Sequence, residues 1–440
     1  MTDQPWTGRR VHVLGIGGAG MSAYALAAQA LGATVTGSDR ASSPYLERVR
    51  AAGIAAVVGH DGANVPAGDG VEVFASTAVP ADNPEVVAAH ARGLEVRPRE
   101  DLLAELTALR RTIAVAGAHG KTTTSAMVAH VLLECGLDPG YLIGGVVRST
   151  GSNGAWGGGE WLVVEADESD RSMLRLHVDV AVVTNVELDH HATYADLDEL
   201  EDCFRAFLRG APQAIVWRRP ELLALREKLP VIAYDVDDAD AALSAQGSRF
   251  AWRGEEVVLR VPGIHNARNA AAALEASALV GVAPADAVRA IGTFAGAGRR
   301  FERLGETAWG ALVVDDYAHH PTEVAATIAA ARTLGAGRRV VAIFQPHLYS
   351  RTQALAGDFG TALRGADEVV LLDVYPARER AEDFPGVSSQ LVVWATDDRA
   401  HWWRRPESAP GLLEKLSGRG DVLLFMGAGD IDRLARSFVV

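Results

Sequence analysis

Cysteine, long apolar runs and positive charge are all scarce in this chain. It has two cysteines in 440 residues, Cys135 and Cys203, so we expect neither a disulfide framework nor a zinc site built from cysteine. No apolar run approaches the roughly 18 residues of a membrane-spanning helix. The first residues lack the charged and apolar regions of a signal peptide. We therefore expect a cytoplasmic protein with no membrane partner.

The net charge of −14 argues against nucleic acid as a partner, because such binding depends on a basic surface that releases phosphate counterions. The pair Trp402-Trp403 is accordingly interpreted as packing rather than as a platform for stacked bases. A small anionic ligand stays compatible with this charge, since a phosphate site needs only a few local cations and oriented backbone N–H groups.

Glycine turns separate apolar strands from helical segments along the whole chain. With a prior of roughly 150 residues per domain, 440 residues predict three domains. The alternation of strand and helix signals predicts parallel strands joined by crossover helices. We predict an α/β protein of three α/β domains, residues 1–110, 111–297 and 298–440.

A glycine-rich loop follows the first apolar strand. The segment Gly15–Gly20 (GIGGAG) fits the pattern G-x-G-x-x-G, and Asp39 closes the second predicted strand. Such glycines let the backbone approach a diphosphate, whose charge the following helix N-terminus attracts. The loop predicts a nucleotide diphosphate site, although a tight strand–helix turn would show the same glycines.

A second glycine loop, Gly117–Thr123 (GAHGKTT), lies between an apolar strand and an amphipathic helix. Its backbone N–H groups can hold phosphate oxygens, Lys121 adds positive charge near the terminal phosphates, and a following threonine hydroxyl can reach Mg²⁺. The loop is shorter than the standard phosphate-binding loop, because Val115 stands where that pattern has glycine. It predicts an ATP site of an uncommon kind.

Acidic residues follow two further strands. Glu165–Asp170 (EADESD) comes directly after the predicted strand Trp161–Val164, and Thr184–His191 (TNVELDHH) ends another. The carboxyl ends of parallel strands form the ligand edge of a sheet. A carboxylate, an imidazole and a threonine there could hold one or two Mg²⁺ ions. Taken alone, these acidic segments are as typical of solvated loops as of a metal site. Because they accompany a phosphate loop, the metal site is the favoured interpretation.

Six segments resemble the motifs of the Mur ligases in order and spacing. They are Ala116–Thr124, Glu165–Asp170, Thr184–His190, Gly263–Asn269, Gly296–Phe301 and Asp315–Val324. Within that family, the loop Gly15–Met21, the string EADESD, and the pair DDYAHHP (315–321) with FQPH (344–347) resemble the alanine-adding member. The resemblance covers nearly the whole chain.

The resemblance implies a Rossmann-like N-terminal domain that binds UDP, a central P-loop ATPase-type domain and a Rossmann-like C-terminal domain that binds the amino acid. The implied contacts of UDP-N-acetylmuramate are Gly15, Gly17, Gly18, Ala19, Gly20, Met21, Ser38, Asp39, Ser76 and Arg99. Those of ATP are Gly117, His119, Gly120, Lys121, Thr122, Thr123, Asn266, Asn269, Arg300, Asp316 and Tyr317. Those of Mg²⁺ are Thr122, Glu165 and His190, and those of the reaction centre and L-alanine are His319, His347 and Arg351.

The implied reaction joins L-alanine to a carboxylate through an acyl phosphate. Lys121, Arg300 and Mg²⁺ would stabilise charge on the transferred phosphoryl group. An imidazole, His319 or His347, would accept the proton of the attacking amine. The implied catalytic set is Lys121, His190, Arg300, His319 and His347.

Two departures from the family pattern bear on this reading. His191 stands where the family often has methionine, and residues 192–219 contain no lysine, so the carbamylated lysine of later family members is absent. The alternatives are a recycling ligase that attaches a preformed peptide to UDP-N-acetylmuramate, a folylpolyglutamate-type ligase, and a nucleotide-binding regulator without catalysis. The sequence leaves open whether the chain is a monomer or a homodimer.

Overall fold

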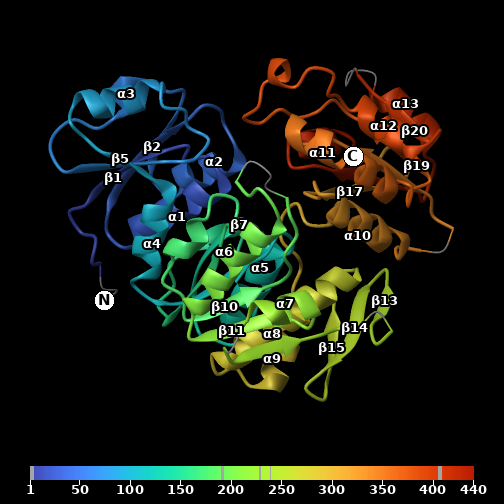
Figure 1. Ribbon diagram of the computed structural model, residues 1–440, viewed down its shortest axis with the longest axis horizontal. Coiled ribbons are helices and arrows are strands. Elements are labelled where there is room, and N and C mark those ends of the chain that lie inside the picture. The colour runs from blue at the N-terminus through green and yellow to red at the C-terminus, as the bar shows by residue number, and fades with distance from the viewer. Residues whose placement is uncertain (1–3, 190–192, 227–228, 238, 336, 405–408) are drawn as a thin grey trace. The chain divides into compact units, whose positions relative to one another are not determined.

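A computed structural model describes residues 4–189, 193–226, 229–237, 239–335, 337–404 and 409–440 (Figure 1). The chain forms two compact units. The first contains Met1–Asp235 and Ala271–Ile291, and the second contains Val236–Ala270 and Gly292–Val440. Helix α8 (Ile264–Leu279) contributes residues to both units. None of the helices in the described part of the chain combines the length and apolarity needed to cross a bilayer.

The first sheet of unit 1 is entirely parallel, in the order β3-β2-β1-β4-β5. Its strands are β1 (Arg10–Leu14), β2 (Thr34–Asp39), β3 (Ala55–Val58), β4 (Val71–Ala75) and β5 (Val96–Pro98). The accompanying helices are α1 (Ala19–Ala30), α2 (Pro44–Ala51), α3 (Pro84–Ala91) and α4 (Arg99–Thr107), with a 3₁₀ turn η1 (Gly62–Asn64). This strand order is that of a Rossmann-type domain, whose ligands bind beyond the carboxyl ends of the strands.

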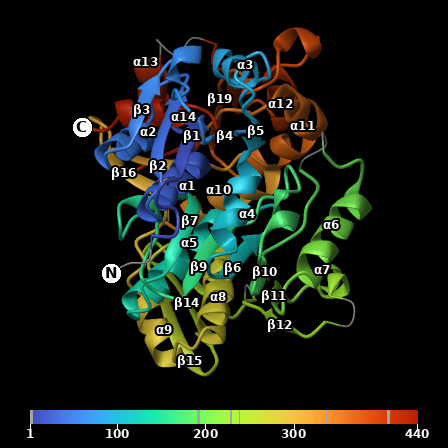
Figure 2. The ribbon, with the colours of Figure 1, turned by 90° about the vertical axis from the view of Figure 1, so that its left-hand side faces the viewer.

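The second sheet of unit 1 has the order β12-β11-β10-β6-β9-β7-β8, parallel except for the β7–β8 pair. Figure 2 shows β9, β6 and β10 side by side in this sheet. The strands are β6 (Arg111–Ala116), β7 (Gly140–Val147), β8 (Ser152–Ala155), β9 (Trp161–Glu165), β10 (Val180–Val183), β11 (Gln213–Trp217) and β12 (Val231–Tyr234). The helical elements are α5 (Lys121–Glu134), η2 (Ser172–Arg175), α6 (Leu197–Arg209), α7 (Pro220–Leu225) and α9 (Pro284–Ile291).

Unit 2 contains a small antiparallel sheet and a larger, mainly parallel one. The small sheet consists of β13 (Ala242–Ser244), β14 (Gly247–Trp252) and β15 (Glu255–Leu259). The larger sheet, in the order β16-β17-β21-β18-β19-β20, consists of β16 (Glu302–Glu306), β17 (Leu312–Asp316), β18 (Val340–Phe344), β19 (Glu368–Leu371), β20 (Ala400–Trp402) and β21 (Val422–Met426). Its helical elements are α10 (Pro321–Arg332), α11 (Tyr349–Leu363), η3 (Ala381–Asp383), α12 (Gln390–Thr396), α13 (Ala409–Leu416) and α14 (Ile431–Ser437).

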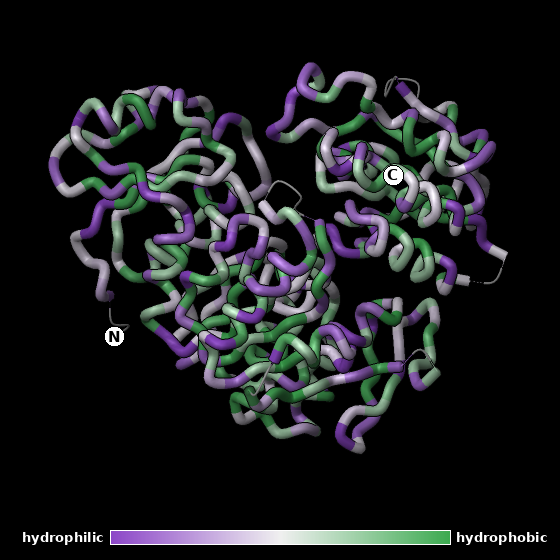
Figure 3. The backbone as a smooth tube through the Cα atoms, in the orientation of Figure 1, coloured by the Kyte–Doolittle hydropathy of each residue, from purple (hydrophilic) through white to green (hydrophobic). Residues whose placement is uncertain are grey.

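The central strands are nearly continuous apolar runs because helices cover both of their faces. All residues of β10, β18 and β21 are buried, as expected for parallel strands covered on both faces. Figure 3 shows such hydrophobic segments alternating along the chain with hydrophilic ones. Trp403 is buried in the core of unit 2 with Leu413 and Phe425, in keeping with the packing interpretation of this tryptophan.

Several helices begin where the sequence provides a cap. The Ser43 hydroxyl accepts a hydrogen bond from the Leu46 N–H, with Pro44 at the first helical position of α2. The Asp196 carboxylate accepts from the Glu199 N–H at the start of α6. Such caps satisfy N–H groups that a helix leaves unpaired. Helix α5 begins differently, at Gly120 with a left-handed φ of 81° and no hydrogen bond from a capping side chain; the N-terminus of a helix attracts anions.

The predicted alternation of parallel strands and helices is present, and the strand predicted at Trp161–Val164 is β9 (Trp161–Glu165). The antiparallel strands β8, β13–β15 and β16 were not predicted. They are short and partly exposed, so they lack the buried apolar run on which the prediction relied.

Candidate functional site

The loop after β1 is held tightly by its neighbours. Gly15 and Ile16 donate their N–H groups to the Ser38 carbonyl, and the Gly17 N–H donates to Asp39 Oδ2 at 2.9 Å. Gly15 has φ 80°, and an added Cβ would lie 2.9 Å from Ser76 Cβ. Ser38, Asp39 and Ser76, all predicted for the same ligand, therefore lie at the loop and shape it.

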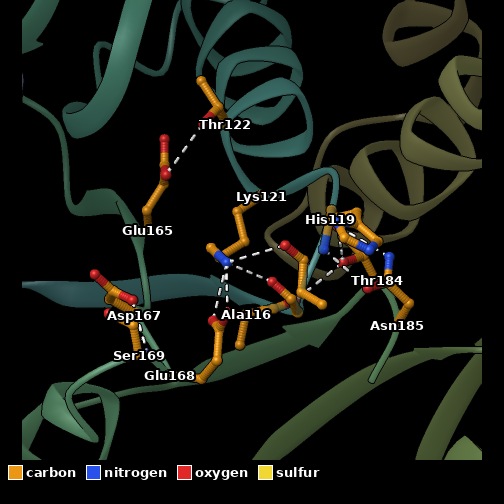
Figure 4. A network of polar contacts seen from close by, with 12 residues as sticks. Ala116, His119, Lys121, Thr122, Glu165, Asp167, Glu168, Ser169, Thr184 and Asn185 are labelled. Atoms are coloured by element: carbon orange, nitrogen blue, oxygen red, sulfur yellow. Dashed lines mark hydrogen bonds and ion pairs between the residues drawn. The ribbon is translucent and has the colours of Figure 1, made fainter. Parts of the chain in front are cut away.

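The phosphate loop lies between β6 and α5, with Lys121 as the first residue of the helix (Figure 4). The Lys121 ammonium donates to the Gly117 carbonyl at 2.6 Å and contacts both carboxylate oxygens of Glu168, at 2.9 and 3.0 Å. Burial by itself would lower the pKa of Lys121, but the charges of Glu168 and Asp167 outweigh burial and raise it. The ammonium is thus fixed as a cation at the helix N-terminus.

Two residues after β10 brace the phosphate loop. The Asn185 side chain accepts from the His119 N–H at 2.9 Å and donates to the His119 carbonyl at 3.0 Å. The Thr184 hydroxyl donates to the same carbonyl at 2.6 Å. Gly117 allows this approach, since an added Cβ would lie 2.1 Å from Thr184 Oγ1. These hydrogen bonds hold both the N–H group and the carbonyl of His119 in place.

A hydroxyl and a carboxylate meet on the other side of Lys121. Thr122 Oγ1 donates to Glu165 Oε2 at 3.2 Å, and Glu165 Oε1 accepts from the Gly144 N–H at 2.6 Å. These are two of the three residues predicted for Mg²⁺, and the structure brings them together. The third, His190, lies outside the described residues, as does His191.

Arg99 joins the region of the first sheet to the acidic loop after β9. Its guanidinium pairs with Asp167 at 2.6 Å and with Asp170 at 2.7 Å. Burial alone would raise the pKa of Asp167, but the charges of Arg99 and Lys121 outweigh it and hold that pKa well below its usual range. Arg99 Nη1 would lie 3.9 Å from a Cβ added at Gly20, so Arg99 also adjoins the first glycine loop.

In unit 2, Asp316 at the end of β17 organises the segment before β16. Its carboxylate accepts from the Phe301 N–H and the Ala318 N–H, each at 2.7 Å. Burial raises its pKa to about 6 against the opposing effect of Arg300. The guanidinium of Arg300 lies 5.0 Å from the ring centroid of Tyr317 and 3.6 Å from Glu323 Oε1. The structure therefore groups Arg300, Asp316 and Tyr317.

Two histidines from the segments that follow β17 and β18 face each other. The ring centroids of His319 and His347 are 6.1 Å apart in an edge-to-face arrangement. His319 Nδ1 lies 3.1 Å from Glu323 Oε2, and His347 Nδ1 lies 3.2 Å from the Arg351 guanidinium. An imidazole beside a carboxylate and one beside a guanidinium have opposite electrostatic surroundings. His319, His347 and Arg351 thus form one cluster.

Asn266 and Asn269 are both buried near the start of α8. The Asn266 amide donates to the Pro262 carbonyl at 2.7 Å and so stabilises the turn that begins the helix. Burial lowers the pKa of the adjacent His265 to about 4, which keeps that imidazole neutral.

The sequence-predicted residues thus fall into one group in each unit. Unit 1 holds the two glycine loops, Thr122 and Glu165, and unit 2 holds the histidine and arginine cluster with the two asparagines. Sequence reasoning missed Glu168, Thr184 and Asn185 as functional side chains. The signal was available, since each follows a buried parallel strand at the edge where Glu165 was expected.

Three family models together match most of the chain. The Mur ligase family, catalytic domain, matches residues 10–111; the Mur ligase middle domain matches residues 115–277; and the Mur ligase, glutamate ligase domain, matches residues 299–429.

Relatives match over nearly the full length. UDP-N-acetylmuramate–L-alanine ligase of Rubrobacter xylanophilus is 43% identical, with 96% of this chain and 98% of the relative covered. Among solved structures, the UDP-N-acetylmuramate-alanine ligase of Thermotoga maritima is 30% identical with a TM-score of 0.81, and covers 98% of each chain. A murein peptide ligase of Psychrobacter arcticus is 26% identical with a TM-score of 0.73 over 98% of each chain.

Proposed function

This chain belongs to the Mur ligase family, and we propose that it uses ATP to join L-alanine to the carboxylate of UDP-N-acetylmuramate in the synthesis of peptidoglycan precursors. The observation that carries the proposal is the 43% identity, over 96% of this chain, to a relative named for that reaction. Because the three family models follow one another along the chain, we retain residues 1–110, 111–297 and 298–440 as its UDP-substrate, ATP and amino-acid domains.

Unit 1 would bind the two nucleotides. The loop Gly15–Met21, with Ser38, Asp39 and Ser76, would receive the diphosphate of the sugar nucleotide. The phosphate loop would receive ATP at the N-terminus of α5, where backbone N–H groups and the helix dipole attract anions. Lys121 would exchange its contact with Glu168 for a phosphate oxygen as ATP binds. This arrangement supports activation of the substrate carboxylate as an acyl phosphate.

The chemistry of Thr122 and Glu165 fits a magnesium ion. A hydroxyl oxygen and a carboxylate oxygen 3.2 Å apart belong to the oxygen donors that Mg²⁺ prefers. When bound, Mg²⁺ would neutralise charge on the phosphate oxygens. Thr122 and Glu165, with His190, are therefore proposed to hold it.

Unit 2 would supply the second half of the reaction. Asn266, Asn269, Asp316 and Tyr317 are proposed to contact the nucleotide of ATP, and Arg300 the transferred phosphoryl group. Arg351 suits the carboxylate of alanine, because a guanidinium pairs with a carboxylate through two hydrogen bonds. The amine must be neutral to attack, so His319 or His347 is proposed to accept its proton. We also propose that the reaction takes place in the cytoplasm.

The test measures phosphate release from ATP in the presence of UDP-N-acetylmuramate and Mg²⁺. Three reactions are compared, with L-alanine, with the tripeptide of a recycling reaction, and with no amine. We expect release only with L-alanine, and a rate lower by about 10²-fold or more from Lys121→Ala. Arg378→Ala, which changes an exposed loop residue, should retain the wild-type rate.

The other outcomes separate the alternatives. Release only with the peptide would assign the chain to the reaction named for the Psychrobacter arcticus relative. Nucleotide binding without release for any acceptor would favour a regulator that does not catalyse.

A further inference from the structure

A buried polar cluster lies within the first sheet of unit 1, among residues to which the proposed function gives no role. Its centre is Glu85, in the first turn of α3, whose side chain is fully buried. The apolar residues Leu14, Val73 and Val86 pack together in this domain. The Glu85 carboxylate accepts hydrogen bonds from His12 Nε2 at 2.8 Å, His60 Nδ1 at 3.0 Å, Asn64 Nδ2 at 3.0 Å and the Asp61 N–H at 3.3 Å.

The carboxylate of Glu85 is ionised. Burial by itself would raise its pKa, but the hydrogen bonds, that of His12 first, outweigh burial and lower the pKa to about 2. An ionised carboxylate can only accept hydrogen bonds. The ring nitrogen of each histidine that faces it must therefore carry a proton, which is Nε2 in His12 and Nδ1 in His60.

In the neutral form of such a ring, the opposite nitrogen is a hydrogen-bond acceptor. In His12 that nitrogen, Nδ1, is 2.8 Å from the Thr36 hydroxyl, which donates to it within the protein. In His60 the corresponding nitrogen is Nε2, for which the described residues supply no hydrogen bond. The His60 side chain is 17% exposed, whereas that of His12 is 1% exposed. Of the two, only His60 can offer its acceptor to a ligand.

His60 also lies at the ligand edge of the sheet. It follows β3, and its Nδ1 is 3.0 Å from the hydroxyl of Ser38 in β2. The carbonyl of Ser38 in turn accepts the N–H groups of Gly15 and Ile16 in the first glycine loop. The buried carboxylate is thus connected through His60 and Ser38 to the loop proposed to hold the diphosphate.

We propose that Glu85 is a positioning residue for the sugar-nucleotide site, because it holds His60 in the tautomer that presents Nε2 as an acceptor to an O–H or N–H group of the bound nucleoside. A neutral acceptor suits a hydroxyl or an amide N–H and does not suit a phosphate, which has no hydrogen to donate at neutral pH. The diphosphate would bind to the glycine loop, and His60 would recognise the uncharged end of the ligand. This inference rests on the proposed function for the identity of that ligand.

The test is Glu85→Leu, which roughly keeps the size of the side chain and removes both acceptor oxygens. The hydroxyl of Ser38 then remains beside His60 Nδ1 and can donate to it, so the proton of the neutral ring is expected to move to Nε2. The ¹⁵N chemical shifts of the ring nitrogens in histidine-labelled protein report the tautomer of His60 without any substrate. We expect Nδ1–H in the wild type, and a shift toward Nε2–H in Glu85→Leu.

The kinetic readout is the KM for UDP-N-acetylmuramate. Loss of one hydrogen bond predicts a rise of roughly 3- to 10-fold, with kcat and the KM values for ATP and L-alanine unchanged. His60→Asn should give the same rise, since asparagine can donate to Glu85 but has no group at the Nε2 position. Two controls should leave this KM unchanged: Glu95→Leu, the same chemical change at an exposed position, and Thr36→Val, which removes only the donor to His12.

The proposal is overturned if His60 already carries its proton on Nε2 in the wild type. It is also overturned if Glu85→Leu lowers the melting temperature but leaves the KM for the sugar nucleotide at the wild-type value, since Glu85 would then be purely structural. Failure of the proposed function looks different, because the wild type would then release no phosphate in response to L-alanine while the tautomer of His60 could still be read.

Discussion

At the scale of single residues, Gly117 determines whether the phosphate loop can form. Its φ of 136° is unfavourable for other residues, and an added Cβ would lie 2.1 Å from Thr184 Oγ1 and 3.0 Å from the Asn185 carbonyl oxygen. Gly117→Ala must therefore displace the residues that brace His119. We predict at least about a tenfold weaker binding of ATP, the equivalent of about 1.4 kcal/mol, measured by calorimetry.

Gly136→Ala is the matched control for that substitution. Gly136 also has a positive φ, 76°, but nothing lies within 4 Å of an added Cβ. Both variants carry the backbone strain of a left-handed alanine, about 1 kcal/mol, and only Gly117→Ala adds a collision in the loop. Equal ATP affinity in the two variants would show that the contact with Thr184 is unimportant.

Asp315 is a second residue whose environment makes a prediction. It is fully buried beside Arg299, whose Nε is 3.4 Å away. Burial raises its pKa from 3.8 to about 7 in the folded protein. Between those pH values the unfolded chain is ionised while the folded chain holds the proton, so the contribution of Asp315 to stability falls as pH rises through this range.

Asp315→Asn removes that dependence, because the amide does not ionise. Relative to the wild type, the variant should gain about 1–3 kcal/mol in free energy of unfolding between about pH 5 and about pH 8. Urea denaturation at both pH values measures the difference. A constant offset between variant and wild type at the two pH values would mean that Asp315 is ionised throughout.

At the scale of elements, the sequence predicted what depends on local pattern. Apolar runs such as Val180–Val183, followed by glycine or acidic loops, identify parallel strands and the edge where ligands bind. Strand β16 is half-exposed with a mixed polar sequence, so its place in the sheet is fixed by packing against β17 and not by its own pattern.

For the candidate site too, the sequence predicted which residues belong together but not which side chains pair. The sequence predicted that Glu165 and Thr122 belong to one site, because both follow strands at the same sheet edge. It could not predict that Glu168 pairs with Lys121 while Asp167 pairs with Arg99. Asp167 and Glu168 are adjacent in the sequence, so only the three-dimensional path of the loop decides which cation each one meets.

The loop after β10 makes a prediction at this scale, because it holds a different element in place. The Thr184 hydroxyl donates to the carbonyls of Ala116 and His119, on the two sides of Gly117. Thr184→Val keeps the shape and removes the donor. The Asn185 amide still donates to the His119 carbonyl and the residue 184 N–H to the Ala116 carbonyl, so the cost is that of one lost hydrogen bond, about 0.5–1.5 kcal/mol. We expect the KM for ATP to rise about 2- to 10-fold, with little change in the KM for UDP-N-acetylmuramate.

Thr184→Ser keeps the hydroxyl and should retain the wild-type KM for ATP. If Thr184→Ser raised this KM as much as Thr184→Val does, the methyl group would be the important part of the side chain, and the hydrogen-bonded brace would have no role.

At the scale of the whole molecule, the chain passes between its two units at residues 235–236, 270–271 and 291–292. Lys121 and Arg300 are both proposed to stabilise the same transferred phosphoryl group. Groups that act on one transition state have strongly non-additive effects when removed, whereas groups that serve independent steps do not.

The last prediction follows from this non-additivity. Lys121→Ala and Arg300→Ala should each reduce kcat for L-alanine-dependent phosphate release by about 10²-fold or more, and the double variant should be little slower than the slower single variant. Combining Lys121→Ala with Arg378→Ala, at an exposed position, is the control for adding a second substitution and should reproduce the rate of Lys121→Ala alone. If the effects of Lys121→Ala and Arg300→Ala multiplied fully, the two cations would act in separate steps, and the assignment of Arg300 to the phosphoryl group would be wrong.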